Sequence, residues 1–331
     1  ASNDHIHWAW KSKPPFTSTL GDFSPSGWST VTNFFTNNYR GHHMQIVTDS
    51  GTDLSLTKEE LADLNIHVVP LNVHLDEVTY REGLDITPGE FYPLLEKSEN
   101  MPTTSQPSTG EFSNTYQKIL ETDPDILSIH ISSGLSGTYS SALAASKLHP
   151  EANITVVDTK TLSAAAGWQV EAAARAIKSG WSLDKVTSLI RTIGEASESI
   201  YTLNELQYLI HGGRISHMKG LLASVLNIKP LIGVEKVKGT YVQIGQSRTF
   251  KKAVEGLVKI IAEKHLPGSP LRVQVLHSFN FEGAEKLRNL IDKTFECTWL
   301  PEGHMSLVLG AHTGPSMVGV AYAPQSIFTD L

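Results

Sequence analysis

The chain has 331 residues, of which 40% are hydrophobic and 18% charged, a balance typical of globular proteins and long enough for about two domains. Its single cysteine, Cys297, excludes an internal disulfide and is consistent with a reducing cytoplasm. The formal net charge of −7 argues against a nucleic-acid partner, because such proteins usually present a basic face. No apolar run approaches the roughly 20 residues that a membrane-spanning helix needs, so we expect no stable membrane insertion.

The first 43 residues differ in composition from the rest of the chain. They are rich in Ser, Thr, Asn, Trp and Phe, and they lack the basic start and apolar core of a secretory signal. The run Gly41-His42-His43-Met44 is typical of a cloning junction followed by a start methionine. We therefore expect residues 1–43 to be vector-derived, with a genuine N-terminal extension as the alternative, and they carry no part of the functional prediction.

From Gln45 onward the sequence predicts alternating strands and helices. A short strand ends near Thr48, and Thr57-Lys58-Glu59-Glu60 then has the Thr-x-x-Glu spacing of a capping box, which predicts a helix to about Leu64. Further strands are expected at 66–73, 126–132 and 154–157, and further helices at 138–148 and up to Lys178. Alternation of this kind predicts a mainly parallel sheet with helices on both faces.

The order of predicted strands and helices changes after about residue 197. The expected elements are a hairpin of 230–237 and 240–247, helices at 250–265 and 282–293, a strand at 271–277, and two short strands at 306–309 and 318–323. This pattern indicates a more antiparallel sheet. The predicted fold class is therefore two-domain α/β, with an N-terminal domain over residues 44–200 and a C-terminal α/β domain over residues 201–331.

Three hydroxyl-rich segments are candidates for a binding site. They are Asp49–Asp53, Thr103–Ser108 and Ser132–Tyr139. In an open parallel sheet, ligands bind at the carboxyl ends of the strands, where helix N-termini present free N–H groups. The third segment is the most informative, because its glycines permit close backbone approach and its hydroxyls can donate to a carboxylate or phosphate. Any one of these loops can equally be an ordinary helix N-cap.

Single residues carry weaker signals. The serine loop around Ser136 lacks the spacing of a G-x-S-x-G nucleophile elbow, and no dinucleotide fingerprint, P-loop or H-E-x-x-H motif occurs. His130, in an apolar strand, is predicted to be a core histidine, whereas His312 can either face a pocket or serve only its loop. Arg214 and Arg248 can each bind a phosphate or an acidic partner surface, or simply be solvated.

Together these segments resemble the DegV family of bacterial fatty-acid-binding proteins, over about residues 45–328. The matching motifs, in chain order, are Val47–Ser50 (VTDS), Thr104–Ser108 (TSQPS), Ser132–Tyr139 (SSGLSGTY), Gly212–Ile215 (GGRI), Arg248–Ala253 (RTFKKA) and His312–Pro315 (HTGP). One departure is Ser316, where the family often has glycine. The order and spacing of the six motifs make the resemblance specific.

The resemblance implies a cytoplasmic lipid carrier rather than an enzyme. Such a protein buries one long-chain fatty acid, of the palmitate or oleate class, between its two domains, with the second domain closing over the ligand. The carboxylate would contact Thr104 and Ser136, with His312 nearby and Ser105 and Ser133 as further candidates. The bound acid would be presented to a separate fatty-acid kinase, which makes an acyl phosphate for phospholipid synthesis.

The resemblance also implies that Arg214 and Arg248 dock the kinase, and it implies no catalytic residue, metal or cofactor. One alternative is a serine-dependent hydrolase or a phosphotransferase that uses Ser136 with His312 as its base. A second is an interaction module without a small ligand, which would leave the hydroxyl loops unexplained.

Overall fold

The computed structural model describes residues 44–329 except 219–227. The predicted origin of residues 1–43 lies outside the described residues. The described residues belong to a single compact unit. None of the described helices is both long and apolar enough to cross a membrane.

The first half is built on a parallel sheet of four strands in the order β2-β1-β6-β7. Their bounds are β1 (Gln45–Asp49), β2 (Ile66–Val69), β6 (Asp125–His130) and β7 (Asn153–Asp158). The strands alternate: Ile46 and Leu127 enter the apolar core on one face, whereas Val47 and Ile126 enter the core on the other. The predicted parallel sheet, covered on both faces, is therefore confirmed.

Helices on the two faces close these cores. The first face is covered by α1 (Lys58–Asp63), α5 (Ser163–Lys178) and α6 (Leu183–Ala196), and the second by α3 (Thr109–Leu120) and α4 (Thr138–Ser146). The predicted capping box is present, because the Thr57 hydroxyl accepts from the Glu60 N–H while the Glu60 carboxylate accepts from the Thr57 N–H. Helix α5 ends before Gly180, whose φ of 81° suits a glycine stop.

The second half is built on a mostly antiparallel sheet in the order β10-β9-β8-β14-β11-β12, with β13 also paired to β11. Its strands are β8 (Glu198–Thr202), β9 (Lys229–Val234), β10 (Tyr241–Ser247), β11 (Pro270–His277), β12 (Glu296–Trp299), β13 (Gly303–His304) and β14 (Val318–Pro324). Only β12 and β13 run parallel to their partner. The antiparallel hairpin of β9 and β10 confirms the prediction.

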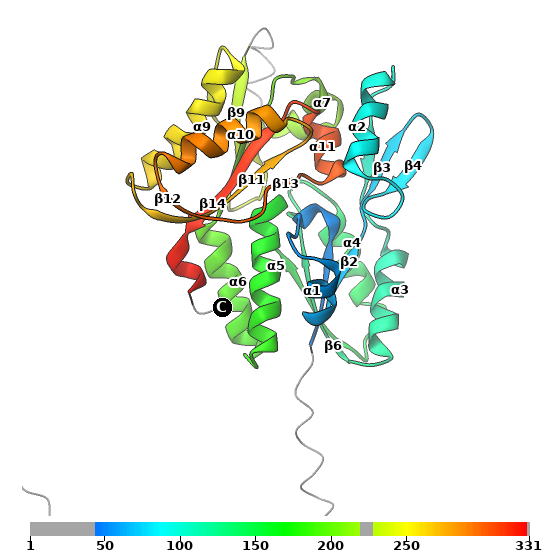
Figure 1. Cartoon of the computed structure of the whole chain (residues 1–331). Helices are drawn as coiled ribbons and strands as arrows, with labels where there is room; N and C mark the ends of the chain where they lie inside the picture. The colour runs from blue at the N-terminus through cyan, green and yellow to red at the C-terminus, as the bar shows by residue number, and fades with distance from the viewer. Residues whose placement is uncertain (1–43, 219–227, 330–331) are drawn as a thin grey trace, which may run out of the picture. The chain divides into compact units, whose positions relative to one another are not determined.

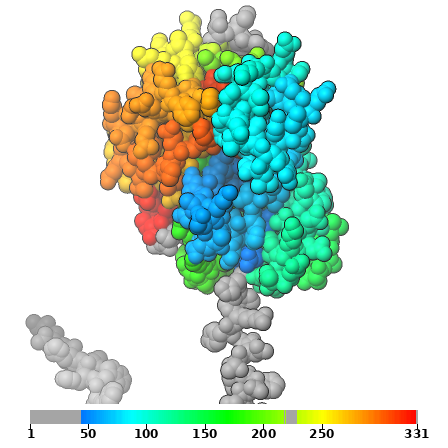
Figure 2. Space-filling model, turned by 45° about the vertical axis from the view of Figure 1, so that its right-hand side comes forward, coloured from blue at the N-terminus to red at the C-terminus, as the bar shows by residue number. Residues whose placement is uncertain are grey.

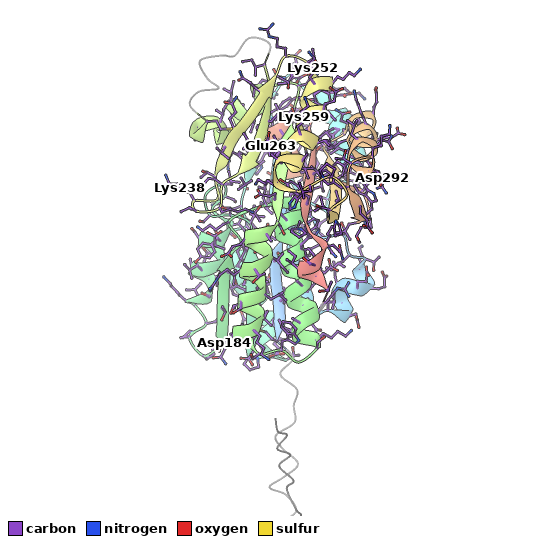
Figure 3. All side chains as sticks on the ribbon, turned by 90° about the vertical axis from the view of Figure 1, so that its left-hand side faces the viewer. Asp184, Lys238, Lys252, Lys259, Glu263 and Asp292 are labelled. Carbon is purple, nitrogen blue, oxygen red and sulfur yellow. The ribbon has the colours of Figure 1, made fainter. Side chains whose placement is uncertain are left out.

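Two helices, α9 (Phe250–Lys264) and α10 (Phe281–Asp292), pack together over one face of this second sheet (Figure 1). Buried Val254 and Leu257 on α9 and Leu287 on α10 share a core with Val273 of β11. Exposed side chains, among them Lys252, Lys259 and Glu263, follow the outer side of α9 (Figure 3). This amphipathic pattern explains why the sequence predicted both helices correctly.

A small antiparallel sheet, ordered β4-β3-β5, was not predicted. Its strands are β3 (Asn72–Leu75), β4 (Val78–Arg81) and β5 (Thr103–Ser105). The single strand expected at 66–73 is wrong: the chain leaves the parallel sheet at Pro70, which cannot donate a ladder hydrogen bond, and enters this second sheet. Asp76 and Glu77, both at positive φ, form the tight turn between β3 and β4.

The predicted strand at 306–309 is also wrong, because these residues begin α11 (Leu307–Thr313). All seven residues of α11 are buried, so the sequence carries no amphipathic period that would mark a helix. His312, expected in a loop, therefore lies on this helix. The strand predicted at 318–323 is confirmed as β14.

The two halves share a central apolar core, to which the small sheet and the antiparallel sheet both contribute. It includes side chains from β3 (Val73), α2 (Pro88–Lys97), α7 (Gln207–His211), β9 (Ile232) and α11. In Figure 2, residues of the first half (blue and cyan) lie directly beside residues of the second half (orange). Among the described residues, three short 3-10 turns complete the elements: η1 (Ser50–Thr52), η2 (Arg214–His217) and η3 (Gln325–Phe328).

Candidate functional site

Four of the five predicted contact residues line one cavity between the two halves. Thr104 comes from β5, Ser136 from the loop between β6 and α4, and His312 from α11, and all three line a cavity of about 20 Å³. We call it the hydroxyl cavity. The rest of its lining is Leu71, Ser105, Gln106, Ile131, Leu135, Leu162, Arg214, Tyr241, Val308 and Leu309. Residues more than 200 positions apart thus share one small space.

Thr104 and His312 form a direct pair, with 2.7 Å between the Thr104 Oγ1 and the His312 Nε2. Burial, together with the nearby charges of Arg214 and His211, lowers the pKa of His312 to about 3. The ring is therefore neutral near pH 7. Its Nδ1 has no hydrogen-bond partner among the described residues. Gly212 lies against this nitrogen, where a Cβ would overlap it, so a glycine is needed at that position.

Ser136 lies just before α4, whose N-cap residue is Gly137 and therefore has no side chain to cap the helix. Its Oγ lies 2.8 Å from the Thr138 Oγ1 and accepts from the Thr138 N–H at 3.3 Å. The loop is tied to the second half at Gly134, where a Cβ would overlap the carbonyl oxygen of Lys238 in the β9–β10 turn. Close backbone approach at this glycine therefore brings the serine loop and the second sheet together.

Arg214 supplies the one cation in this lining, which contains no aspartate or glutamate among the described residues. Its Nη1 donates to the Gly212 carbonyl at 2.6 Å and its Nε to the Leu135 carbonyl at 3.4 Å. These bonds hold the guanidinium at the edge of the cavity. Arg248, which the sequence grouped with Arg214, is exposed at the end of β10 and does not line the cavity.

Ser105 and Ser133, the two further candidates for contact with the carboxylate, differ in position. Ser105 lines the hydroxyl cavity, but its Oγ also lies 3.0 Å from the His74 Nε2. Ser133 is exposed outside the cavity, where Lys160 donates to its Oγ at 3.2 Å. The structure therefore brings Ser105 to the other contact residues and leaves Ser133 apart from them.

The first hydroxyl-rich segment, Asp49–Asp53, does not reach this cavity either. Asp49 accepts from the ring of His130, with 2.9 Å between Oδ2 and Nδ1, and His130 Nε2 lies 2.6 Å from the Ser128 Oγ. All three residues are fully buried. His130 is thus a core histidine satisfied by its neighbours, as predicted, and this network holds β1 to β6.

Two partly buried acids hold the start of α11: Asp53, from the first hydroxyl-rich segment, and Glu82, which sequence reasoning missed. Asp53 accepts from the Ser306 N–H at 2.8 Å, and Glu82 accepts from the Ser306 hydroxyl at 2.7 Å and from the Leu307 N–H. We call this pair the acid clasp. Burial raises the pKa of Asp53 well above its usual value and that of Glu82 to about 7. Nothing in the local sequence marks Glu82, because its partners at the start of α11 lie more than 200 residues away.

The hydroxyl cavity adjoins an apolar space deeper in the protein. Leu162 lines both the hydroxyl cavity and a hollow of about 10 Å³, the inner hollow. The other walls of the inner hollow include Ile200, Leu276, Met305 and Val320. A polar, positively charged end and an apolar continuation suit an anion that carries a hydrocarbon tail.

The described residues show neither the arrangement of a serine hydrolase triad around His312 nor a cluster of metal ligands. The His312 Nε2 contacts Thr104 rather than Ser136, and no acid lies against its Nδ1 to orient the ring as in a serine hydrolase triad. Within residues 44–218 and 228–329, no three His, Cys, Asp or Glu side chains gather where they could hold a metal ion.

Comparison with known proteins relates this arrangement to one family. The DegV family, described as uncharacterised proteins, matches residues 43–325. A DegV domain-containing protein of Staphylococcus aureus is 34% identical over 275 residues, which is 83% of this chain and 96% of that protein. The protein DegV of Bacillus subtilis is 29% identical over 283 residues, covering 85% of this chain and 99% of its own.

Solved structures of similar proteins have the same fold. A fatty-acid-binding DegV family protein from Thermus thermophilus is 30% identical, with a TM-score of 0.76 over 85% of this chain and 99% of its own. A stearic-acid-binding protein from Eubacterium ventriosum is 26% identical, with a TM-score of 0.72 over 85% of this chain and 98% of its own. The chain belongs to the DegV family, because the family matches most of the chain and the two-domain architecture is the same.

Proposed function

We propose that this protein binds one long-chain fatty acid, with its carboxylate in the hydroxyl cavity and its acyl chain in the apolar interior. The observation that carries the proposal is the convergence of Thr104, Ser136 and His312 on a cavity with one cation and no acid in its described lining. Fatty-acid binding by the similar proteins from Thermus thermophilus and Eubacterium ventriosum supports it.

The chemistry of the cavity fits a carboxylate. An ionised carboxylate is costly to bury without donors. Since His312 is neutral, its Nε2–H can donate to the Thr104 Oγ1, which leaves the threonine hydroxyl proton free for the ligand. Ser136 supplies a second hydroxyl, and Arg214 supplies the compensating charge.

The acyl chain needs only apolar walls, and each methylene that it buries is worth roughly 0.8 kcal/mol. The inner hollow, reached past Leu162, offers such walls from both halves of the chain. We therefore propose that residues 44–200 and 201–331 act as two domains, with the second closing over the ligand.

Bound lipid tests the proposal directly. Protein purified from a bacterial host should release palmitate- or oleate-class acids on solvent extraction, detected by mass spectrometry. Thr104→Ala and Ser136→Ala should each weaken binding by about 1–3 kcal/mol, because each removes one donor. The matched controls are Thr103→Ala, an exposed neighbour on β5 outside the cavity, and Ser140→Ala, exposed on α4. Protein that stays free of lipid when offered palmitate would contradict the proposal.

We also propose that the protein is a carrier rather than an enzyme and presents its bound acid to a separate fatty-acid kinase, which forms the acyl phosphate. Because such a kinase uses ATP, we place this exchange in the cytoplasm. Arg248 is exposed and free of the cavity lining, so it is available to an acidic partner surface. Arg214, at the edge of the cavity, can contact both the carboxylate and a docked kinase.

Two arginine variants separate these roles. Arg248→Ala should spare palmitate binding and lower phosphorylation of the bound acid by a partner kinase. Arg214→Ala should lower both, because it removes the only cation in the described lining of the cavity. Equal loss of lipid binding in the two variants would show that Arg248 serves the ligand and not a partner.

A further inference from the structure

A second, larger cavity opens on the other part of α11. Whereas Val308, Leu309 and His312 line the hydroxyl cavity, Ser306 and Leu307 line a cleft of about 790 Å³, the outer cleft. Its walls come from the segment after β1, from the segment between β4 and α2, and from residues 301–307. Pockets that hold small organic ligands usually have volumes of about 300–1,000 Å³, so this cleft is large enough for a ligand or for part of one.

The chemistry of the outer cleft favours an apolar occupant. Leu56, Leu61 and Ile86 line it, and so do Val68 and Leu84, which are 41% and 66% exposed. The acid clasp also lines the cleft, but the oxygens of both carboxylates already accept hydrogen bonds from serines or from the start of α11. These acids disfavour an anion and leave few free acceptors for a polar ligand.

The outer cleft adjoins the proposed acyl path, because the two share lining residues. Leu162 lines both the hydroxyl cavity and the inner hollow, and Leu276 and Met305 line both the inner hollow and the outer cleft. Among the described residues, no others line both the inner hollow and the outer cleft. Methionine is unbranched and has three rotatable bonds, so it can change its packing at low cost. The wall shared by the inner hollow and the outer cleft thus contains a side chain, Met305, that can change its packing.

We propose that the outer cleft receives the methyl end of long acyl chains, with Met305 as the movable partition that lets the chain pass. This inference rests on the proposed fatty-acid binding. The enclosed spaces are small, about 20 Å³ in the hydroxyl cavity and about 10 Å³ in the inner hollow, so a long chain must gain room by displacing side chains. Displacing Met305 gives access to a cleft that is already open.

The inference predicts how affinity depends on chain length. Short acids end inside the enclosed path, and changes in the outer cleft do not affect them. Acids long enough to pass Met305 bury their last methylenes against Leu84 and its neighbours. The protein would therefore tolerate long chains that a closed tunnel of fixed length would reject.

The test measures the affinities of the delipidated full chain for laurate, palmitate, stearate and behenate. Leu84→Glu places a charge on an exposed wall of the cleft, where it should not disturb folding. We expect behenate binding to weaken about tenfold, the equivalent of two methylene groups left in water, and laurate binding to stay unchanged. Leu148→Glu is the matched control, because Leu148 is 60% exposed and does not line the cleft.

A second variant changes the partition itself. Met305→Phe should weaken the longest acids more than laurate, since a stiffer, larger side chain blocks the passage. If all variants keep the chain-length profile of the unaltered protein, the cleft takes no part and this inference is overturned, while fatty-acid binding stands. If the unaltered protein binds none of the four acids, the proposed function itself fails and the inference with it.

Discussion

The His312 ring is held in place at both of its nitrogens. Thr104 bonds its Nε2, and the backbone of Gly212 packs against its Nδ1. Gly212 has a φ of −69°, a value that any residue adopts, so backbone strain does not explain the glycine. A glycine is required at this position because a side chain would occupy the space of the ring.

Gly212→Ala should therefore act through His312 alone. We expect a loss of about 1–3 kcal/mol in the free energy of unfolding and weaker palmitate binding, because the new methyl group forces the imidazole away from Thr104. Denaturant unfolding and ligand titration measure the two effects. Gly89→Ala is the control, since no heavy atom lies within 4 Å of a Cβ built there.

A double variant shows whether the ring is the cause. In a His312→Ala background, Gly212→Ala should cost almost nothing, since the atoms that it would overlap are gone. If the two losses simply add, the methyl group must act on some other neighbour.

At the scale of elements, α11 shows where sequence reasoning fails. Its residues are buried on every side, so the run Leu307–Thr313 has the pattern of a buried strand as much as that of a helix. The helix begins where it does because Asp53 and Glu82, distant in sequence, accept from Ser306 and Leu307. A single chain read in sequence order cannot reveal such partners.

Elements with local signals were predicted more reliably. The capping box at Thr57 and the alternation of exposed and buried residues on α9 and α10 were sufficient to predict those helices. Of the site, the motifs indicated Thr104, Ser136 and His312, but not that Thr104 belongs to an antiparallel sheet of its own. They also did not indicate that Arg214 lines the same cavity.

The acid clasp predicts a pH dependence of stability. Burial raises the pKa of Glu82 from 4.5 to about 7 in the folded protein. Between these two values the folded state keeps a proton that the unfolded state has released. Unfolding then releases that proton, so the free energy of unfolding falls as the pH rises from about 4.5 to 7, by about 3 kcal/mol for this group.

Glu82→Gln should remove this contribution. We expect the free energy of unfolding of the variant to vary less between about pH 4.5 and 7 than that of the unaltered protein, whatever its absolute stability. Denaturant titrations at a series of pH values measure the slope. Glu99→Gln, at an exposed position, should keep the original slope. The same slope in Glu82→Gln would mean that another group titrates in this range.

At the scale of the whole molecule, the hydroxyl cavity is lined by residues from both halves of the chain. The serine loop follows β6 of the parallel sheet, whereas Arg214 and His312 belong to the half that contains the antiparallel sheet. Contacts such as Gly134 against Lys238 already bring the halves together. A ligand in the cavity adds a further connection, so its binding energy should stabilise both halves at once.

Hydrogen exchange can detect this shared stabilisation. With palmitate at 100 times its Kd, binding adds about 2.7 kcal/mol, and amides that exchange only when the cavity opens should exchange up to about a hundredfold more slowly. We expect this slowing both in the 132–137 loop and in α11. The outer side of α9, where Lys252, Lys259 and Glu263 lie and do not line the cavity, provides the internal control (Figure 3). Slowing confined to one half would show that the ligand binds to that half alone, and the cavity between the halves would not be its site.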